Sequence, residues 1–291
     1  MQQIERGIYY ETSYQGVTLG GLVFSYGTIL IDAPLRPEDA RSWRSTLLNQ
    51  RGGANRLLIN LDTHPDRTLG SRAMDCTIVA HQKAAQVFRN RPTIFKGQSI
   101  ETGSAWELYS DAIGMRWATP DVTFSEQLSL HWGGPDVLVD YRPGPAPGAS
   151  WVSVPAQKVL FVGDLVVVDQ PPFFANADLD VWLHSLDLLL DDYRDYNVIS
   201  GRGGPVTVEQ IREQRSFIVL VSQELEKLSK RNAPADAIEK LATRLFSKFK
   251  PPAHEEERYR RRLRYGLVQF YNRHYRSISS VDQEVVAEEQ E

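Results

Sequence analysis

The sequence is poor in several features that define whole classes of protein. Its 291 residues include a single cysteine, Cys76, so an internal disulfide is excluded and a reducing compartment is expected. No apolar run reaches the roughly 18 residues that a membrane-spanning helix needs. The first residues also lack the basic and apolar segments of a signal peptide. We therefore expect a soluble, cytoplasmic protein that does not act at a membrane.

An excess of positive charge is also missing. Lysine and arginine number 33 against 37 aspartate and glutamate residues, which gives a formal net charge of −4. Such a chain has no general attraction for nucleic acid. One run, 258–265, is dense in arginine and tyrosine, but three glutamates at 255–257 precede it and can form ion pairs at i,i+4 spacing. We expect a solvated helix face or a homodimer surface there.

The residues that are present favour a globular fold with a large core. Apolar residues make up 42% of the chain and charged residues 24%. Short apolar runs alternate with turn residues through the first two hundred positions, whereas helical periodicity dominates from Val208 onward. The pattern predicts a first domain over 1–205 and a C-terminal helical extension over 206–277. An acidic tail over 278–291 is expected to be disordered.

Five short segments follow one another in an order that resembles the metallo-β-lactamase superfamily. Asp62-Thr63-His64-Pro65-Asp66-Arg67 comes after an apolar strand, where the family has H-x-H-x-D-H. Ile29–Asp32 resembles the family's early strand that ends in Asp, and Arg142–Ala149 resembles its P-G-H-T-P-G-S loop. Leu160–Asp164 resembles its L-F-x-G-D strand end, and Ile199–Gly204 resembles its G-H-G turn. The resemblance spans roughly residues 16 to 205. It implies an α/β (α+β) fold, a four-layer αββα sandwich, with the helical extension added.

The resemblance also implies where two metal ions would be held, and most of those positions are altered. The corresponding residues are Asp62, His64 and Pro145 for the first metal, Asp66, Arg67 and Arg202 for the second, and Asp164 as the bridge. Proline has no side-chain donor, and arginine stays protonated and cannot ligate a cation. We expect a network linking Arg67, Asp66, Asp164 and Arg202 in place of the second metal.

The first metal position is left open by the sequence. Asp62, His64 and Asp164 could together hold one divalent cation such as zinc, iron or manganese, so we expect either no metal or one. A single metal would still activate water for hydrolysis. In that case Asp66 and Asp164 are the candidate catalytic carboxylates. Arg67 and Arg202 could bind a carboxylate or phosphate of a ligand.

Two functions remain open at this point. The favoured interpretation is a metallo-β-lactamase-fold protein that lacks the usual dinuclear site and two-metal hydrolase activity and binds a small-molecule ligand or a partner, as a pseudoenzyme would. The alternative is a divergent hydrolase with at most one metal, acting on a small ester, thioester or anionic substrate. Whether the chain is an enzyme is therefore left undecided.

Several other residues have a structural and a functional interpretation. Asp32 stands at a strand end before Ala-Pro, where we favour a turn cap over an orienting role in the site. His81 is expected to be structural and His131 to be half-buried packing. Phe173 and Phe174 follow Asp164 closely, and they could either contact a ligand or close the core.

Overall fold

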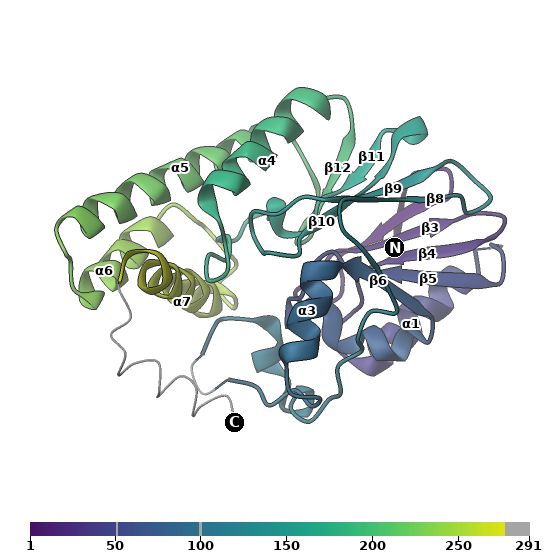
Figure 1. Ribbon diagram of the computed structural model, residues 1–291, viewed down its shortest axis with the longest axis horizontal. Coiled ribbons are helices and arrows are strands. Elements are labelled where there is room, and N and C mark those ends of the chain that lie inside the picture. Colours follow the sequence, from purple (N-terminus) through teal and green to yellow (C-terminus); the bar gives the residue numbers. More distant parts are fainter. Residues whose placement is uncertain (51, 99–100, 277–291) are drawn as a thin grey trace.

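The computed structural model describes residues 1–50, 52–98 and 101–276, in which two β-sheets lie face to face (Figure 1). The first sheet has the order β1-β2-β3-β4-β5-β6-β7, antiparallel up to β4 and parallel from β4 to β7. Its strands are Gln2–Glu5, Ile8–Glu11, Leu19–Val23, Gly27–Ile31, Asn55–Ile59, Thr77–His81 and Val122–Phe124.

The second sheet has the order β13-β12-β11-β10-β9-β8. Its pairs are antiparallel except for β11 and β12, which run parallel. Its strands are Gln127–Leu130, Val137–Tyr141, Ser150–Val154, Val159–Phe161, Asn197–Ser200 and Gly204–Val206, for β8 to β13 in chain order.

Helices cover the outer face of each sheet, which completes the four layers. In Figure 1, α1 and α3 flank the first sheet, whereas α4 and α5 flank the second. Strand β4 illustrates why both faces of a sheet are covered, because its successive side chains point to opposite faces. Ile29 and Ile31 pack between the sheets, while Leu30 packs against Trp43 of α1. The αββα sandwich predicted from the sequence is confirmed. The bounds of α1 to α4 are Pro37–Leu48, Pro65–Thr68, Gln82–Asn90 and Leu179–Asp192.

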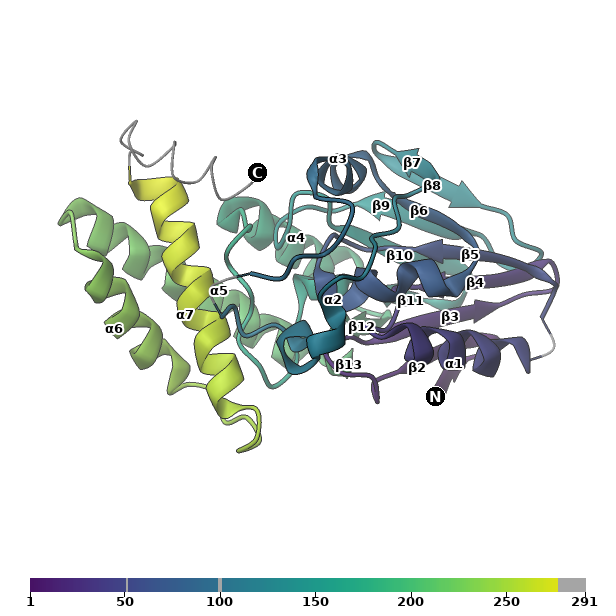
Figure 2. The same ribbon diagram turned by 90° about the horizontal axis from the view of Figure 1, so that it is seen from below.

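The C-terminal helices pack on the second sheet's side of the molecule (Figure 2). They are α5, Val208–Lys230, α6, Ala235–Phe246, and α7, Glu256–Tyr275. Thr207 and Gln210 form a capping box that starts α5. Leu263 and Leu267 of α7 share one apolar cluster with Trp151 of β10, so elements on the two sides of the expected boundary near 205 share a core. The expected acidic tail, 278–291, lies outside the described residues.

Short 3-10 helices complete the connections, at Leu69–Met74, Ala105–Leu108, Ser110–Ala112, Pro155–Gln157 and Gly163–Leu165. Two of them border the site described next. Within the described part of the chain, every helix is too short or too polar to span a lipid bilayer.

Candidate functional site

Four strand ends bring ionisable side chains together at one edge of the two sheets. Asp32 follows β4, Asp62 comes shortly after β5, Asp164 shortly after β11, and Arg202 shortly after β12. The strands β4 and β5, and likewise β11 and β12, are parallel neighbours. Their carboxyl ends therefore meet, which places charged groups from distant parts of the sequence side by side.

The turn into α2 positions the signature residues. Pro65 occupies the first turn of this short helix, and His64 is its N-cap, with Nδ1 accepting from the Asp66 backbone N–H at 3.3 Å. The Asp62 carboxylate accepts from the His64 backbone N–H at 2.7 Å. This local hydrogen bonding aims Asp66 and Arg67 inward, where both side chains are fully buried.

Arg67 is surrounded by three carboxylates. Its Nη1 donates to Asp32 Oδ2 at 3.1 Å, its Nη2 donates to Asp164 Oδ1, and its Nε lies 3.5 Å from Asp62 Oδ1. A guanidinium presents several donors in a fixed plane, so one side chain can bridge acceptors from separate strands. Arg67 therefore links the ends of β4, β5 and β11.

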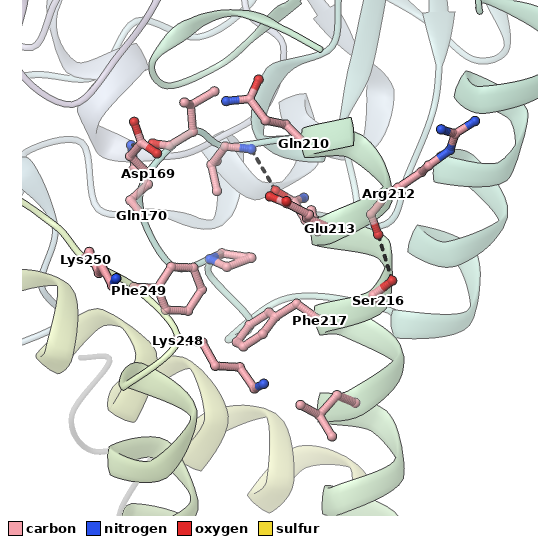
Figure 3. A pocket seen from close by; sticks show the side chains of 15 residues that line it. Asp169, Gln170, Gln210, Arg212, Glu213, Ser216, Phe217, Lys248, Phe249 and Lys250 are labelled. Atoms are coloured by element: carbon pink, nitrogen blue, oxygen red, sulfur yellow. Dashed lines mark hydrogen bonds between the residues drawn. The ribbon is translucent and has the colours of Figure 1, made fainter. Parts of the chain in front are cut away.

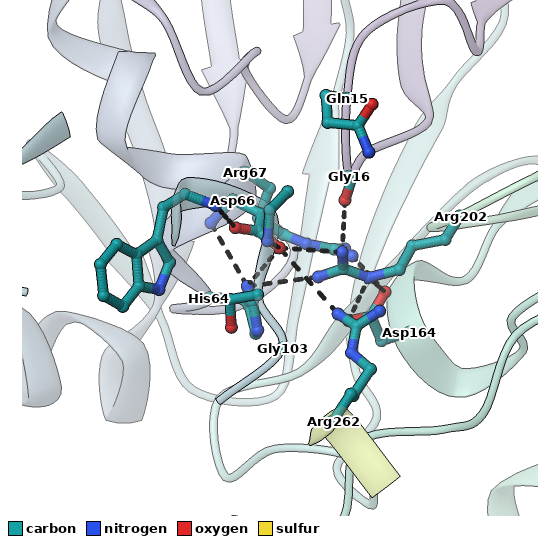
Figure 4. Close-up of polar contacts among 12 residues, drawn as sticks. Gln15, Gly16, His64, Asp66, Arg67, Gly103, Asp164, Arg202 and Arg262 are labelled. Carbon is teal, nitrogen blue, oxygen red and sulfur yellow. Dashed lines mark hydrogen bonds and ion pairs between the residues drawn. The ribbon is translucent and has the colours of Figure 1, made fainter. Parts of the chain in front are cut away.

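Arg202 makes a second set of ion pairs (Figure 4). Its Nε lies 3.1 Å from both oxygens of Asp164, and its Nη1 lies 3.0 Å from Asp66 Oδ2. Its Nη2 lies 3.2 Å from His64 Nδ1. The arginine–carboxylate network expected from the sequence is thus present. The one difference is that Arg67 pairs with Asp32, Asp62 and Asp164, leaving Asp66 to Arg202.

A third arginine reaches this network from α7 and was missed in the sequence. Arg262 is 1% exposed, donates to Gln170 Oε1 at 2.8 Å, and places Nη2 3.9 Å from Asp66 Oδ2. The expectation that the whole 258–265 run is a solvated or dimer surface is therefore wrong. Helical spacing could have indicated this burial from the sequence, because Arg262 lies on the same buried stripe of α7 as Gly266 and Phe270.

Other members of the run behave as the sequence predicts. Arg260 and Arg261 form i,i+4 ion pairs with Glu256 and Glu257. Below we use the term cluster for the seven charged residues of the buried network, which are Asp32, Asp62, Asp66, Arg67, Asp164, Arg202 and Arg262.

Asp32 is part of the cluster and not a simple turn cap, which corrects the interpretation favoured from the sequence. It is fully buried, adopts a left-handed backbone conformation with φ 57°, and accepts from the Leu61 backbone N–H at 2.9 Å. Its other oxygen accepts from Arg67. The carboxylate thereby fixes both the start of the signature loop and the plane of the guanidinium.

The carboxylates of the cluster divide into two kinds. Burial opposes ionisation of Asp66 and Asp164, but nearby positive groups, Arg202 prominent among them, hold the pKa of each well below its ordinary value. Burial raises the pKa of Asp32 to about 7 and also raises that of Asp62, because these two share Arg67 with Asp164. Burial lowers the pKa of His64 to about 3, so its imidazole is neutral at physiological pH.

These residues do not fit the dinuclear metal centre that the sequence resemblance implies. Both oxygens of Asp164 face Arg202, and Pro145 in the loop before β10 has no donor. In the one-metal set, Asp62, His64 and Asp164, three donor positions are already engaged: Asp62 Oδ1 and His64 Nδ1 accept from backbone N–H groups, and Asp164 contacts the guanidiniums of Arg67 and Arg202. Within the described residues, no group of three or more His, Cys, Asp or Glu side chains could hold a metal ion.

A cavity of about 320 Å³ lies beside the cluster. Asp62, His64 and Asp164 contribute to its wall, together with Arg91 and Arg273. Asp66, Arg67 and Arg202, which the sequence suggested as catalytic or ligand-binding residues, are not on that wall and are at most 2% exposed. Burial in ion pairs keeps them out of reach of a ligand in this arrangement.

The remaining sequence expectations have mixed outcomes. Phe173 lines the cavity with its ring edge to face against His64, whereas Phe174 is fully buried in the core. His81 is structural as expected, since it caps α3 and stacks on Tyr141. His131 was expected to be half-buried, but its side chain is 74% exposed.

A larger groove of about 820 Å³ lies elsewhere, along α5 and the segment that joins α6 to α7 (Figure 3). Phe217, Phe249 and Lys248 are among the residues that line it. None of the residues singled out in the signature segments takes part in its wall. The smaller cavity beside the cluster is therefore the candidate site.

Comparison with known proteins identifies the scaffold. The family model of the metallo-beta-lactamase superfamily matches residues 71–201. This span begins after the Asp62–Arg67 signature, so the match is carried by the rest of the scaffold. A search of curated proteins finds none that matches the chain.

Solved structures resemble the chain at low sequence identity. A metallo-beta-lactamase from Pontibacter korlensis is 20% identical, with a TM-score of 0.55 over 75% of this chain and 97% of that one. The DIM-1 metallo-beta-lactamase is 18% identical, with a TM-score of 0.58 over 75% and 95%. The sec-alkylsulfatase Pisa1 from Pseudomonas sp. is 15% identical, with a TM-score of 0.64 over 97% of this chain but 51% of its own. The last likeness extends over the C-terminal helices.

Proposed function

We propose that this chain, which matches the metallo-β-lactamase superfamily model over residues 71–201 and shares that fold, binds a small molecule in the cleft of the fold and does not carry out two-metal hydrolysis. The observation that carries this proposal is the position of Arg202. Its Nε contacts both oxygens of Asp164, the residue at the place of the family's bridging carboxylate. A fold alone does not determine activity, whereas these contacts determine which atoms of Asp164 are open to a metal.

Electrostatics support the proposal. Two guanidiniums already compensate Asp66 and Asp164 at ion-pair distance. A divalent cation at the same place would have to displace arginines that are held by packing and cannot be deprotonated. It would also be repelled by them in a buried, weakly screened environment. The carboxylates are thus satisfied by protein groups, which supports the proposal that no dinuclear centre forms here.

The alternative of a one-metal hydrolase would require Asp164 to release Arg67 and Arg202. Each of these buried guanidiniums would then lose one of its carboxylate partners, and removing one partner of a buried ion pair costs on the order of several kcal/mol. We therefore keep this alternative as an outcome of the test below.

A hydrolysis panel tests the proposal. The purified protein would be assayed on a β-lactam, a secondary alkyl sulfate, an aryl ester, a thioester and a phosphodiester, with added Zn²⁺, Mn²⁺ or Fe²⁺ and with chelator. We expect no turnover above buffer under any condition. Turnover that chelator abolishes, and that Asp164→Asn also abolishes, would overturn the proposal and establish the metal-dependent alternative. Turnover that survives Asp164→Asn would indicate a contaminating enzyme, removed by further purification before the panel is repeated.

A further inference from the structure

Two arginines line the cavity without a carboxylate partner. Arg91 follows α3, donates to the Thr63 carbonyl at 2.9 Å, and lies over the Trp117 ring at 4.5 Å from its centroid. Arg273, in the last turn of α7, donates to the Ala177 carbonyl at 2.8 Å. Among the described residues, neither guanidinium has a carboxylate oxygen within 4.0 Å. Every arginine of the cluster, by contrast, is within that distance of one.

The cluster offsets at most one of these two positive charges. It contains three arginines and four aspartates, and the pKa of Asp32 is raised to about 7 because of its burial. When Asp32 is protonated, three carboxylates face three guanidiniums; when it is ionised, one negative charge is left over. With Arg91 and Arg273 included, the cluster and the cavity wall together carry a net charge of +2 or +1, respectively. Burial lowers the pKa of Arg91 to about 10, which still leaves it cationic at neutral pH.

Aromatic side chains form another part of the cavity wall. Phe173 and Tyr265 stack with their planes 11° apart and their centroids 6.0 Å apart, and Trp106 also lines the space. Such surfaces favour flat apolar groups. The volume, about 320 Å³, is at the lower end of the range for small-molecule sites, roughly 300–1,000 Å³.

We propose that the cavity binds a small organic anion, in which a carboxylate, sulfate or phosphate pairs with Arg91 and Arg273 and a flat apolar group packs on Phe173, Tyr265 and Trp106. This inference rests on the proposed function, because it requires a cleft used for binding. An oxyanion that contacts Arg91 compensates for the water that this half-buried guanidinium has lost, whereas the exposed Arg273 adds a second charge and further donors. A planar guanidinium also matches the geometry of planar or tetrahedral oxyanions. Arg67 and Arg202 then act as scaffold beneath the ligand.

Calorimetric titration with matched probes tests this assignment. The probes are benzoate, phenyl sulfate and phenyl phosphate, with benzamide as the neutral match and inorganic phosphate as the match without a ring. We expect at least one aromatic anion to bind at least tenfold more tightly than both matches. Arg91→Gln and Arg273→Gln should each weaken that binding at least tenfold. Arg212→Gln, which alters an exposed arginine outside this cavity, should leave it unchanged.

The variants must be folded for the result to count. Arg91→Lys keeps the charge while changing the geometry, so it should retain part of the binding that Arg91→Gln loses, and urea unfolding would confirm a native fold for each variant. Equal binding of benzamide and the anions, or wild-type affinity in the Arg91→Gln/Arg273→Gln protein, would overturn the proposal. So would the absence of binding for all three aromatic anions. None of these results bears on metal content or hydrolysis, so failure here is distinguishable from failure of the proposed function.

Discussion

Arg202 shows how a single residue changes the chemistry of the site. Its guanidinium spans Asp164 and Asp66, which stand on segments 98 residues apart, and is itself only 2% exposed. Where a histidine would offer a lone pair to a metal, arginine offers only donors. The same buried carboxylates therefore change from potential metal ligands into ion-pair partners.

The first prediction concerns that ion pair. Arg202→Met removes the charge but keeps much of the volume, leaving Asp66 and Asp164 poorly compensated, so we expect a loss of about 3–5 kcal/mol in unfolding free energy. Arg215→Met is the matched control, because Arg215 pairs with Asp187 at the surface, where such pairs contribute about 0–1 kcal/mol. Urea denaturation measures both. Equal losses in the two variants would contradict the assigned role of the buried pair.

The second prediction concerns pH. The pKa of Asp32 is about 7 in the folded protein against an ordinary 3.8, because of its burial. Below about pH 4 both states are protonated; above it, the unfolded chain loses its proton first, so stability falls as pH rises toward 7. We expect Asp32→Asn to show a smaller decline between pH 5 and 8 than the wild type, by on the order of 1–3 kcal/mol. Because the pKa of Asp62 is also raised, some decline in stability with pH remains in both the wild type and the variant.

Unfolding curves at pH 5 and 8 measure this difference. An identical pH dependence in the two proteins would show that Asp32 is ionised across the whole range. Asp66 and Asp164 act in the opposite direction, since their pKa values are lowered. The stability that these two carboxylates contribute to the folded protein is present above about pH 4 and is lost as the solution becomes more acidic.

At the scale of elements, α7 closes the cluster from the side of the helical extension. Gly103, with φ +73°, lies so near this helix that an added Cβ would come within 2.3 Å of the Arg258 carbonyl oxygen and 2.5 Å of the Arg262 nitrogen. This close approach holds the helix turn that carries Arg262 against the segment before Trp106. Glycine is needed there both for its backbone conformation and for its lack of a side chain.

The third prediction uses that contact. Gly103→Ala should destabilise the protein by roughly 2–4 kcal/mol, because it adds a clash with backbone to the strain of a positive φ. Gly114→Ala provides the control, since its φ is +92° but its Cβ would meet nothing within 4 Å, so only the strain, about 1 kcal/mol, applies. Thermal or urea unfolding compares them. A Gly103 variant no less stable than the Gly114 variant would mean that α7 is not packed there as described.

Elements were largely predictable from sequence, whereas the partners of their side chains were less so. The strands that precede Asp32, Asp62 and Asp164 followed from apolar runs and turn residues, and the order of the motifs indicated the layers. The role of Asp32 was missed because a strand-end aspartate before Ala-Pro has the same pattern whether it caps a turn or enters an ion pair. Arg262 was missed because charge density suggested a surface, although its helical spacing pointed inward.

At the scale of the whole molecule, the fold and the cluster favour different functions. The scaffold resembles the metallo-β-lactamase fold, and the pairing of Asp164 with Arg202 was predicted because both positions could be aligned with the family's ligand positions. The cavity contacts were not predictable in this way. Arg91 and Arg273 lie 182 residues apart, and Arg91 stands in no family motif, so only the folded chain brings them to one cavity.

Metal content tests the central claim most directly. The untagged protein would be incubated with excess Zn²⁺, Fe²⁺ or Mn²⁺, dialysed and analysed by mass spectrometry of the elements, beside an Arg67→His/Arg202→His variant that restores two imidazoles near Asp66 and Asp164. We predict well below one metal ion per chain for the wild type and, for a folded variant, a clear gain in zinc. One or more tightly held metal ions per wild-type chain would contradict the claim that guanidiniums have taken the place of the metals.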